Sequence, residues 1–191
     1  MKKIVYQLAI VWLFSLLANA QPYQWGPATN DICLGTQITS TNWMNQPPFL
    51  CIVVLTNVSS KPILIHVPPI KSRYEVTLIN PLGQVTNLSS DKMKFSTVSG
   101  NRPISLWVNQ IRDTSSFFIM DNFKIETNGL YTLIVASRIA TNFTAPKPKF
   151  PGGLVDQPSI QPVYFLLPPV TNTFNILPEQ LKKQLNSTRQ P

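Results

Sequence analysis

The sequence predicts an all-β protein, an antiparallel sandwich of about seven or eight strands, from three observations. Short apolar and β-branched runs recur along the chain, separated by Pro, Gly, Asn and Ser. No segment before Pro178 shows the apolar period of a helix. Charged residues make up only 13% of the 191 residues, about half of the usual share, which excludes a long solvated helix or a coiled coil.

The first 20 residues have the organisation of a secretory signal peptide. Lys2 and Lys3 supply a positive start, an apolar stretch reaches Leu17, and Ala18-Asn19-Ala20 fits a cleavage site. The stretch is shorter than the roughly 20 residues of a membrane span, which favours cleavage over an uncleaved anchor. We therefore expect a secreted or periplasmic protein whose mature chain begins near Gln21, has no membrane span and carries a net charge of +6.

Four strands are expected in the first half of the mature chain, at residues 32–38, 49–55, 62–67 and 74–79. A loop rich in Ser, Thr, Asn and Pro separates the first two, and Pro68-Pro69 closes the third. The fourth alternates apolar and polar residues, so that Tyr74, Val76 and Leu78 share one face. Residues 80–83 then form a tight turn, because Pro sets φ and Gly accepts a positive φ.

Four more strands are expected in the second half, at residues 103–108, 115–120, 130–135 and 163–167. The run Asn128-Gly129-Leu130-Tyr131 resembles the approach to a tyrosine corner, in which a Tyr at a strand start hydrogen-bonds back across the preceding loop. The alternative is a Tyr131 side chain that only packs in the strand. Either interpretation is typical of a sandwich.

The chain is expected to contain one sandwich domain at residues 21–170 and a tail at 171–191. Nine of the 18 prolines lie between residues 144 and 191, and residues 143–161 form a Pro-rich loop between the last two expected strands. A loop of this length inside a compact domain is often functional. In the tail, Leu177, Leu181 and Leu185 share a face at helical spacing and predict a short C-terminal helix.

Cys33 and Cys51 admit two states. An even number of cysteines in an exported protein favours a disulfide. Both residues, however, lie near the starts of consecutive strands, and in an antiparallel hairpin the start of one strand faces the end of the other. They would then lie well over 10 Å apart, at roughly 3.3 Å per residue, too far for a bridge. A disulfide and two buried free thiols both remain open.

The titratable residues offer little chemistry. The single histidine, His66, lies in an apolar run, where a structural position is typical, and one histidine cannot build a zinc site. The eight acidic residues form neither a calcium loop nor a recognisable catalytic pair. The basic residues are scattered rather than clustered, unlike those of nucleic-acid-binding proteins. We expect no enzymatic activity, no cofactor, no metal and no nucleic-acid partner.

Aromatic side chains are the best binding candidates. Trp43 and the Pro-rich loop residues Phe143, Lys149 and Phe150 make up the expected binding surface, because an exposed ring can stack on a sugar or dock a partner. Trp25 and Trp107 lie in or beside strands. For these two residues, closing the ends of the sandwich is the favoured interpretation.

A family resemblance covers residues 25 to 167. Its motifs, in chain order, are Trp25-Gly26, Leu34-Gly35, a V-x-L-x-N-x-S-x-x-P-I run ending at Ile63, Tyr74-Glu75-Val76-Thr77-Leu78, Pro81-Leu82-Gly83, a G-x-Y-x-L-x-V strand starting at Gly129, and Gln161-Pro162-Val163-Tyr164-Phe165. This order resembles a bacterial exported immunoglobulin-like β-sandwich module of unknown function. The L-x-N-x-S strand end is also distantly similar to the immunoglobulin-like bacterial proteinase-inhibitor domain. The two cysteines and the Pro-rich loop depart from the pattern.

These observations predict an exported, non-enzymatic structural or interaction module. Its partner would be a protein or glycan of the envelope or medium. Carbohydrate binding through loop aromatics such as Trp43 is one alternative. Inhibition of an extracellular protease is another, with Lys149 or Phe150 presented by the Pro-rich loop.

Overall fold

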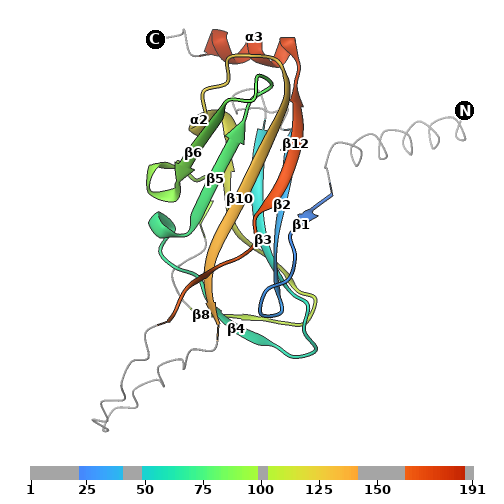
Figure 1. Cartoon of the computed structure of the whole chain (residues 1–191), viewed down its shortest axis with the longest axis vertical. Helices are drawn as coiled ribbons and strands as arrows, with labels where there is room; N and C mark the ends of the chain where they lie inside the picture. The colour runs from blue at the N-terminus through green and yellow to red at the C-terminus, as the bar shows by residue number, and fades with distance from the viewer. Residues whose placement is uncertain (1–21, 41–48, 99–102, 142–161, 188–191) are drawn as a thin grey trace, which may run out of the picture.

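The computed structural model describes residues 22–40, 49–98, 103–141 and 162–187, which form two antiparallel sheets packed face to face (Figure 1). The first sheet has the order β1 (Gln24–Trp25), β2 (Ile32–Ser40), β3 (Phe49–Asn57), β9 (Ile111–Phe118) and β7 (Thr97–Val98). The second contains β6 (Val85–Ser89), β5 (Tyr74–Ile79), β10 (Gly129–Thr141), β4 (Ile63–His66), β8 (Pro103–Leu106), β11 (Phe165–Leu166) and β12 (Val170–Ile176). The predicted all-β sandwich is confirmed.

Four short helical segments complete the described part of the chain: η1 (Ile70–Ser72), η2 (Ser90–Lys92), α2 (Ile119–Asn122) and α3 (Pro178–Ser187). α3 confirms the expected C-terminal helix, and Leu181 on it packs against the core. Among the residues that the structure describes, no helix is both long and apolar enough to cross a bilayer. The expected signal peptide lies outside these residues.

The long strand β10 organises the second sheet. It pairs with β5 and β4 and also with β12 and β11. On each side of β10, the chain segment that pairs with it is interrupted by two prolines. These are Pro68-Pro69 between β4 and β5, and Pro168-Pro169 between β11 and β12. Proline cannot donate a ladder hydrogen bond, so each segment leaves the ladder there. The interruptions lie at the same level of β10, around Ser137 and Arg138.

Strictly alternating residues fill the space between the sheets. β5 buries Tyr74, Val76 and Leu78, as the alternation predicts, and β10 buries Tyr131, Leu133 and Val135. The Tyr131 hydroxyl donates a 2.8 Å hydrogen bond to the carbonyl oxygen of Thr127, four residues earlier. This bond confirms the tyrosine corner.

The structure corrects the expected strands: β8 ends at Leu106 and not at residue 108, β10 runs on to Thr141, and β1, β6 and β7 are additional to the strands expected. The predicted strand 115–120 is β9, which begins at Ile111 and gives way to α2 at Ile119. The predicted last strand 163–167 contains only the two-residue β11. β12 follows it, so that the sheet reaches Ile176 and not residue 170. Sequence reasoning missed β12 because a buried Asn172 interrupts its apolar positions.

Candidate functional site

The four residues of the expected binding surface, Trp43, Phe143, Lys149 and Phe150, lie outside the described residues. The structure therefore does not place the expected loop surface, and its role stays a prediction. Cys33, Cys51, His66, Trp25 and Trp107 lie within the described residues.

Cys33 and Cys51 are free, buried thiols and not a disulfide. β2 and β3 form an antiparallel pair in which Cys33 lies opposite Thr56 and Cys51 opposite Ile38. The two cysteines are thus five ladder positions apart, about 17 Å, whereas a bridge needs Cα atoms within about 7 Å. Burial raises the pKa of both thiols, which keeps them protonated and poor as nucleophiles.

His66 forms a hydrogen-bonded pair with Tyr164. The Tyr164 hydroxyl oxygen lies 2.6 Å from His66 Nδ1, and the ring centroids are 5.6 Å apart. Burial lowers the pKa of His66 and raises that of Tyr164. The described part of the chain holds no group of three or more His, Cys, Asp and Glu side chains suited to a metal ion. The pair fastens the chain entering β11 to β4, in agreement with the structural position expected for His66.

A polar cluster lies buried between the sheets. The Arg73 guanidinium donates from Nε and Nη2 to the carbonyl oxygen of Pro68, at 3.0 and 2.8 Å. The Tyr74 hydroxyl lies 2.9 Å from Thr114 Oγ1 and 2.6 Å from Ser115 Oγ. Thr114 is the extra residue of a bulge opposite Val53 and Val54, and its hydroxyl donates to the Val53 carbonyl. These contacts tie β5 to β9.

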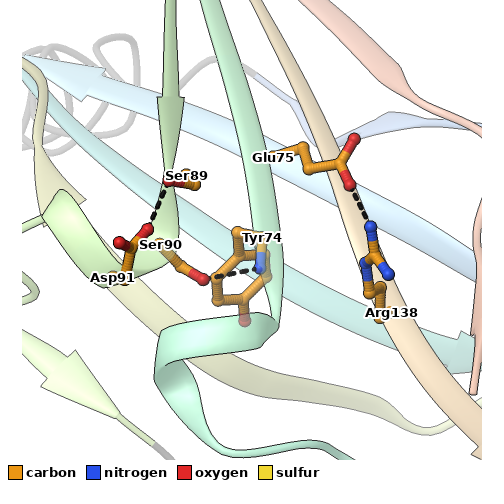
Figure 2. Close-up of polar contacts among 6 residues, drawn as sticks. All are labelled: Tyr74, Glu75, Ser89, Ser90, Asp91 and Arg138. Atoms are coloured by element: carbon orange, nitrogen blue, oxygen red, sulfur yellow. Dashed lines mark hydrogen bonds and ion pairs between the residues drawn. The ribbon is translucent and has the colours of Figure 1, made fainter.

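Figure 2 shows Tyr74 with the polar contacts of its neighbours on β5, β10 and the β6–η2 segment, among them an exposed ion pair that lies outside the buried cluster. The Tyr74 backbone N–H donates a 3.1 Å hydrogen bond to Ser90 Oγ, and Arg138 forms an ion pair with Glu75 on the neighbouring strand. Burial raises the pKa of the Tyr74 phenol. The cluster is closed to solvent, so it serves the fold and offers no open site.

The connection between β8 and β9 presents the most exposed tryptophan of the described residues. Trp107 is 61% exposed, and the exposed Val108 and Ile111 follow it in the chain. The exposed Val58 comes from the β3–β4 connection, beside Asn57, which pairs with Val108 in an isolated parallel bridge. We call these four exposed residues with Asn109 and Gln110 the aromatic turn. The expectation that Trp107 closes the end of the sandwich is therefore wrong, because most of its surface stays exposed instead of packing on the core.

Hydrogen bonds hold the backbone of the aromatic turn. Gln110 N–H donates to the Trp107 carbonyl at 3.0 Å, which closes a tight turn, and Trp107 N–H donates to Gln110 Oε1 at 3.1 Å. Asn109 has a φ of 56°, which Asn tolerates better than most residues. Its N–H donates to the Asn57 carbonyl at 2.9 Å. The exposed indole thus stands on a well-connected backbone.

Asn57, the last residue of β3, holds this turn in place through hydrogen bonds. Its side chain is fully buried, and its Nδ2 donates to the carbonyl oxygens of Lys61 and Leu106, at 2.7 and 3.0 Å. Its Oδ1 accepts from the N–H of Ser59 at 2.8 Å. One amide therefore joins the end of β3, the segment before β4 and the end of β8. This contact could not be predicted from the sequence, because Asn57 and Leu106 are 49 residues apart and no motif links them.

Trp25 differs from Trp107. It pairs with Gly35 in the β1–β2 ladder, and its ring covers that glycine, where a Cβ atom would collide with it. Tyr23 packs against the same ring, with centroids 5.6 Å apart. For Trp25 the packing role holds, although part of the ring remains exposed.

No family model, curated protein or solved structure matches the chain.

Proposed function

We propose that this protein is an exported, non-enzymatic β-sandwich module that binds a partner protein through the aromatic turn. The observation that carries the proposal is the 61% exposed Trp107 on a backbone anchored by the buried Asn57. Trp is the residue type most enriched among binding hot spots, and a fixed backbone lowers the entropy lost on binding. An exposed cluster of large apolar side chains marks an interaction site more often than a scattered one does.

The neighbours of Trp107 favour a protein partner over a glycan. Val58, Val108 and Ile111 are aliphatic and exposed, and such side chains gain by excluding water against another apolar surface. A sugar ring stacks on an indole but also needs polar side chains around it. Gln110 Oε1 is already used by the Trp107 N–H. Carbohydrate binding is therefore the second candidate, carried by the exposed indole alone.

The reactive side chains support a role without catalysis. Burial raises the pKa of both cysteine thiols, and the Nδ1 atom of the single histidine is engaged by Tyr164. The resemblance to exported immunoglobulin-like modules supports the same role. Export rests on the signal-peptide pattern of residues 1–20. Protease inhibition by Lys149 or Phe150 rests on the sequence pattern alone.

Affinity capture from the envelope and culture medium of the producing cells, with quantitative mass spectrometry, tests the proposal. Wild-type protein should capture a defined partner. Trp107→Ala should capture at least about tenfold less of that partner, as expected for a hot-spot residue. Leu82→Ala is the matched control, because Leu82 is exposed on a different turn. Equal capture by Trp107→Ala, or no specific capture by wild type, contradicts the proposal. If wild type binds a glycan on an array and Trp107→Ala does not, the aromatic turn would be a carbohydrate-binding site instead.

A further inference from the structure

β12 is a free edge of the second sheet. Within the described residues it pairs only with β10. The Ser137 carbonyl accepts from Leu167 N–H on the same side of β10, and backbone groups alternate between the two sides of an antiparallel strand. Odd-numbered β10 residues therefore bond to Val170, Asn172, Phe174 and Ile176. The backbone N–H and C=O groups of Thr171, Thr173 and Asn175 point away from the sheet.

Within the described part of the chain, β12 itself has no charged residue, proline or bulge that would hinder strand addition, although the β1 segment approaches its first residue, where Gly26 lies close to Val170. Natural edges are blunted by charged side chains, by proline or by a bulge. β12 has seven residues in an uninterrupted register with β10 and contains neither a charged residue nor a proline. Its outward side chains are small and polar, namely Thr171, Thr173 and Asn175. A second extended chain could therefore pair with the outward backbone groups of Thr171, Thr173 and Asn175.

A groove of about 380 Å³ runs beside this edge and is lined by Pro22, Gln24, Thr171, Asn172 and Thr173. We call it the β12 groove. Its far wall is the β1 segment, which pairs with β2 and not with β12 (Figure 1). The groove thus lies where the edges of the two sheets come together. All five side chains are uncharged, so a charged occupant would lose its hydration without gaining an ionic partner.

The buried side chain of Asn172 lacks one hydrogen bond at this groove. Asn172 is only 2% exposed, and its Nδ2 donates to Thr36 Oγ1 of β2. Its Oδ1 is buried and has no hydrogen-bond donor within the described part of the chain. Buried side-chain acceptors are almost always paired, so an unpaired one calls for an explanation. A hydrogen-bond donor on a molecule bound in the groove would give Asn172 Oδ1 its missing partner.

We propose that the β12 groove binds one extended, uncharged segment of a partner protein, which adds to β12 as a further antiparallel or parallel strand. The outward backbone groups at every second residue require an extended chain. The uncharged lining selects against Lys, Arg, Asp and Glu in the segment. A Ser, Thr, Asn or Gln of the segment that faces inward donates to Asn172 Oδ1. Val85–Ser89 at the opposite edge has free backbone groups too, but the groove and the unpaired acceptor occur at β12. The residues involved are separate from the aromatic turn.

Selection of random heptapeptides displayed on phage against the immobilised protein tests this. The enriched sequences should be uncharged and alternate apolar residues with Ser, Thr, Asn or Gln. A synthetic selected peptide with blocked ends should slow the hydrogen exchange of the Thr171, Thr173 and Asn175 amides by at least about tenfold. Failure to enrich any peptide, or protection located at β6 or at the aromatic turn, overturns the proposal.

Two proline variants localise the binding. Thr173→Pro removes an outward N–H without removing a bond to β10. Asn87→Pro removes an outward N–H on the free edge of β6, together with the exposed side-chain bond from Thr77 Oγ1. We expect Thr173→Pro to weaken peptide binding at least about tenfold and Asn87→Pro to leave it unchanged. Equal affinity in the two variants contradicts the proposal.

A measurement on the peptide covers the case in which Thr173→Pro does not fold. In an added strand every second peptide amide bonds to β12. N-methylation of these amides should abolish binding, and N-methylation of the amides between them should preserve it. Binding that neither set of N-methyl groups weakens overturns strand addition. Sedimentation of the protein alone examines the competing occupant. Self-association that Thr173→Pro abolishes would assign the edge to a second copy of this chain and overturn the partner-protein assignment.

Discussion

Asn57 Nδ2 donates a 3.0 Å hydrogen bond to the carbonyl oxygen of Leu106, 49 residues away in the sequence and fully out of solvent. This single amide connects the first sheet, where Asn57 ends β3, to the second, where Leu106 ends β8. The same residue accepts the N–H of Asn109 through its backbone carbonyl. The aromatic turn therefore depends on the contact between the two sheets, so its stability and its binding should change together.

Asn57→Ala should lower the free energy of unfolding by about 3 kcal/mol, because it leaves buried carbonyl oxygens without their donor. Urea denaturation measures the change. Asn57→Asp should also destabilise the protein, since a carboxylate keeps the acceptor for Ser59 but loses both donors. Asn87→Ala, at an exposed position of β6, is the control and should have little effect. Wild-type stability in Asn57→Ala would show that the amide does not hold the junction.

Tyr131→Phe should destabilise the sandwich by about 1 kcal/mol, the net value of one hydrogen bond to a backbone carbonyl. The change removes the 2.8 Å bond to the Thr127 carbonyl and the 2.9 Å contact with Thr127 Oγ1, whose hydroxyl can turn to another partner, and it leaves the ring packed on Phe174. Tyr164→Phe loses a bond at a more exposed site, to His66, and should cost less. Urea midpoints of both variants measure the difference. The reverse order would contradict the tyrosine corner as the stronger contact.

Stability should fall when the pH drops below the pKa of an ordinary histidine, about 6.5. Burial lowers the pKa of His66 in the folded protein, so the unfolded chain binds the proton first. The stability contribution is complete above the unfolded pKa and is lost as the pH falls through the folded pKa. Because His66 is the only histidine, His66→Asn should flatten the stability curve between about pH 5 and 7. A slope that persists in His66→Asn would have another source.

Ellman's reagent should label neither cysteine quickly in the folded protein. Burial raises the pKa of both thiols and blocks their access to the reagent. In denaturant without reductant, two thiols per chain should react at once. A denatured chain with no reactive thiol would instead contain the disulfide that the β2–β3 register excludes.

The sequence predicted those parts of the fold in which local pattern and burial agree. β5 is an example, since the inward positions Tyr74, Val76 and Leu78 are all apolar and buried. β12 is the opposite case, because its inward position 172 is an asparagine whose partner, Thr36, lies 136 residues earlier. The turn that carries Trp107 is likewise held by a long-range contact, the bond from Asn57 to the Leu106 carbonyl. Contacts between the two sheets set these features, and no local spacing encodes them.

The close approach of Trp25 to Gly35 yields a further prediction. A Cβ atom at position 35 would collide with the Trp25 ring and lie 2.8 Å from Val54 Cγ2. Gly35→Ala should therefore destabilise the protein by about 1–3 kcal/mol through overpacking. In a Trp25→Ala background the same change should cost less, because only the Val54 contact remains. A double-mutant cycle by urea denaturation measures this coupling, and additive effects would show that the ring moves aside freely and does not seal β1 onto β2.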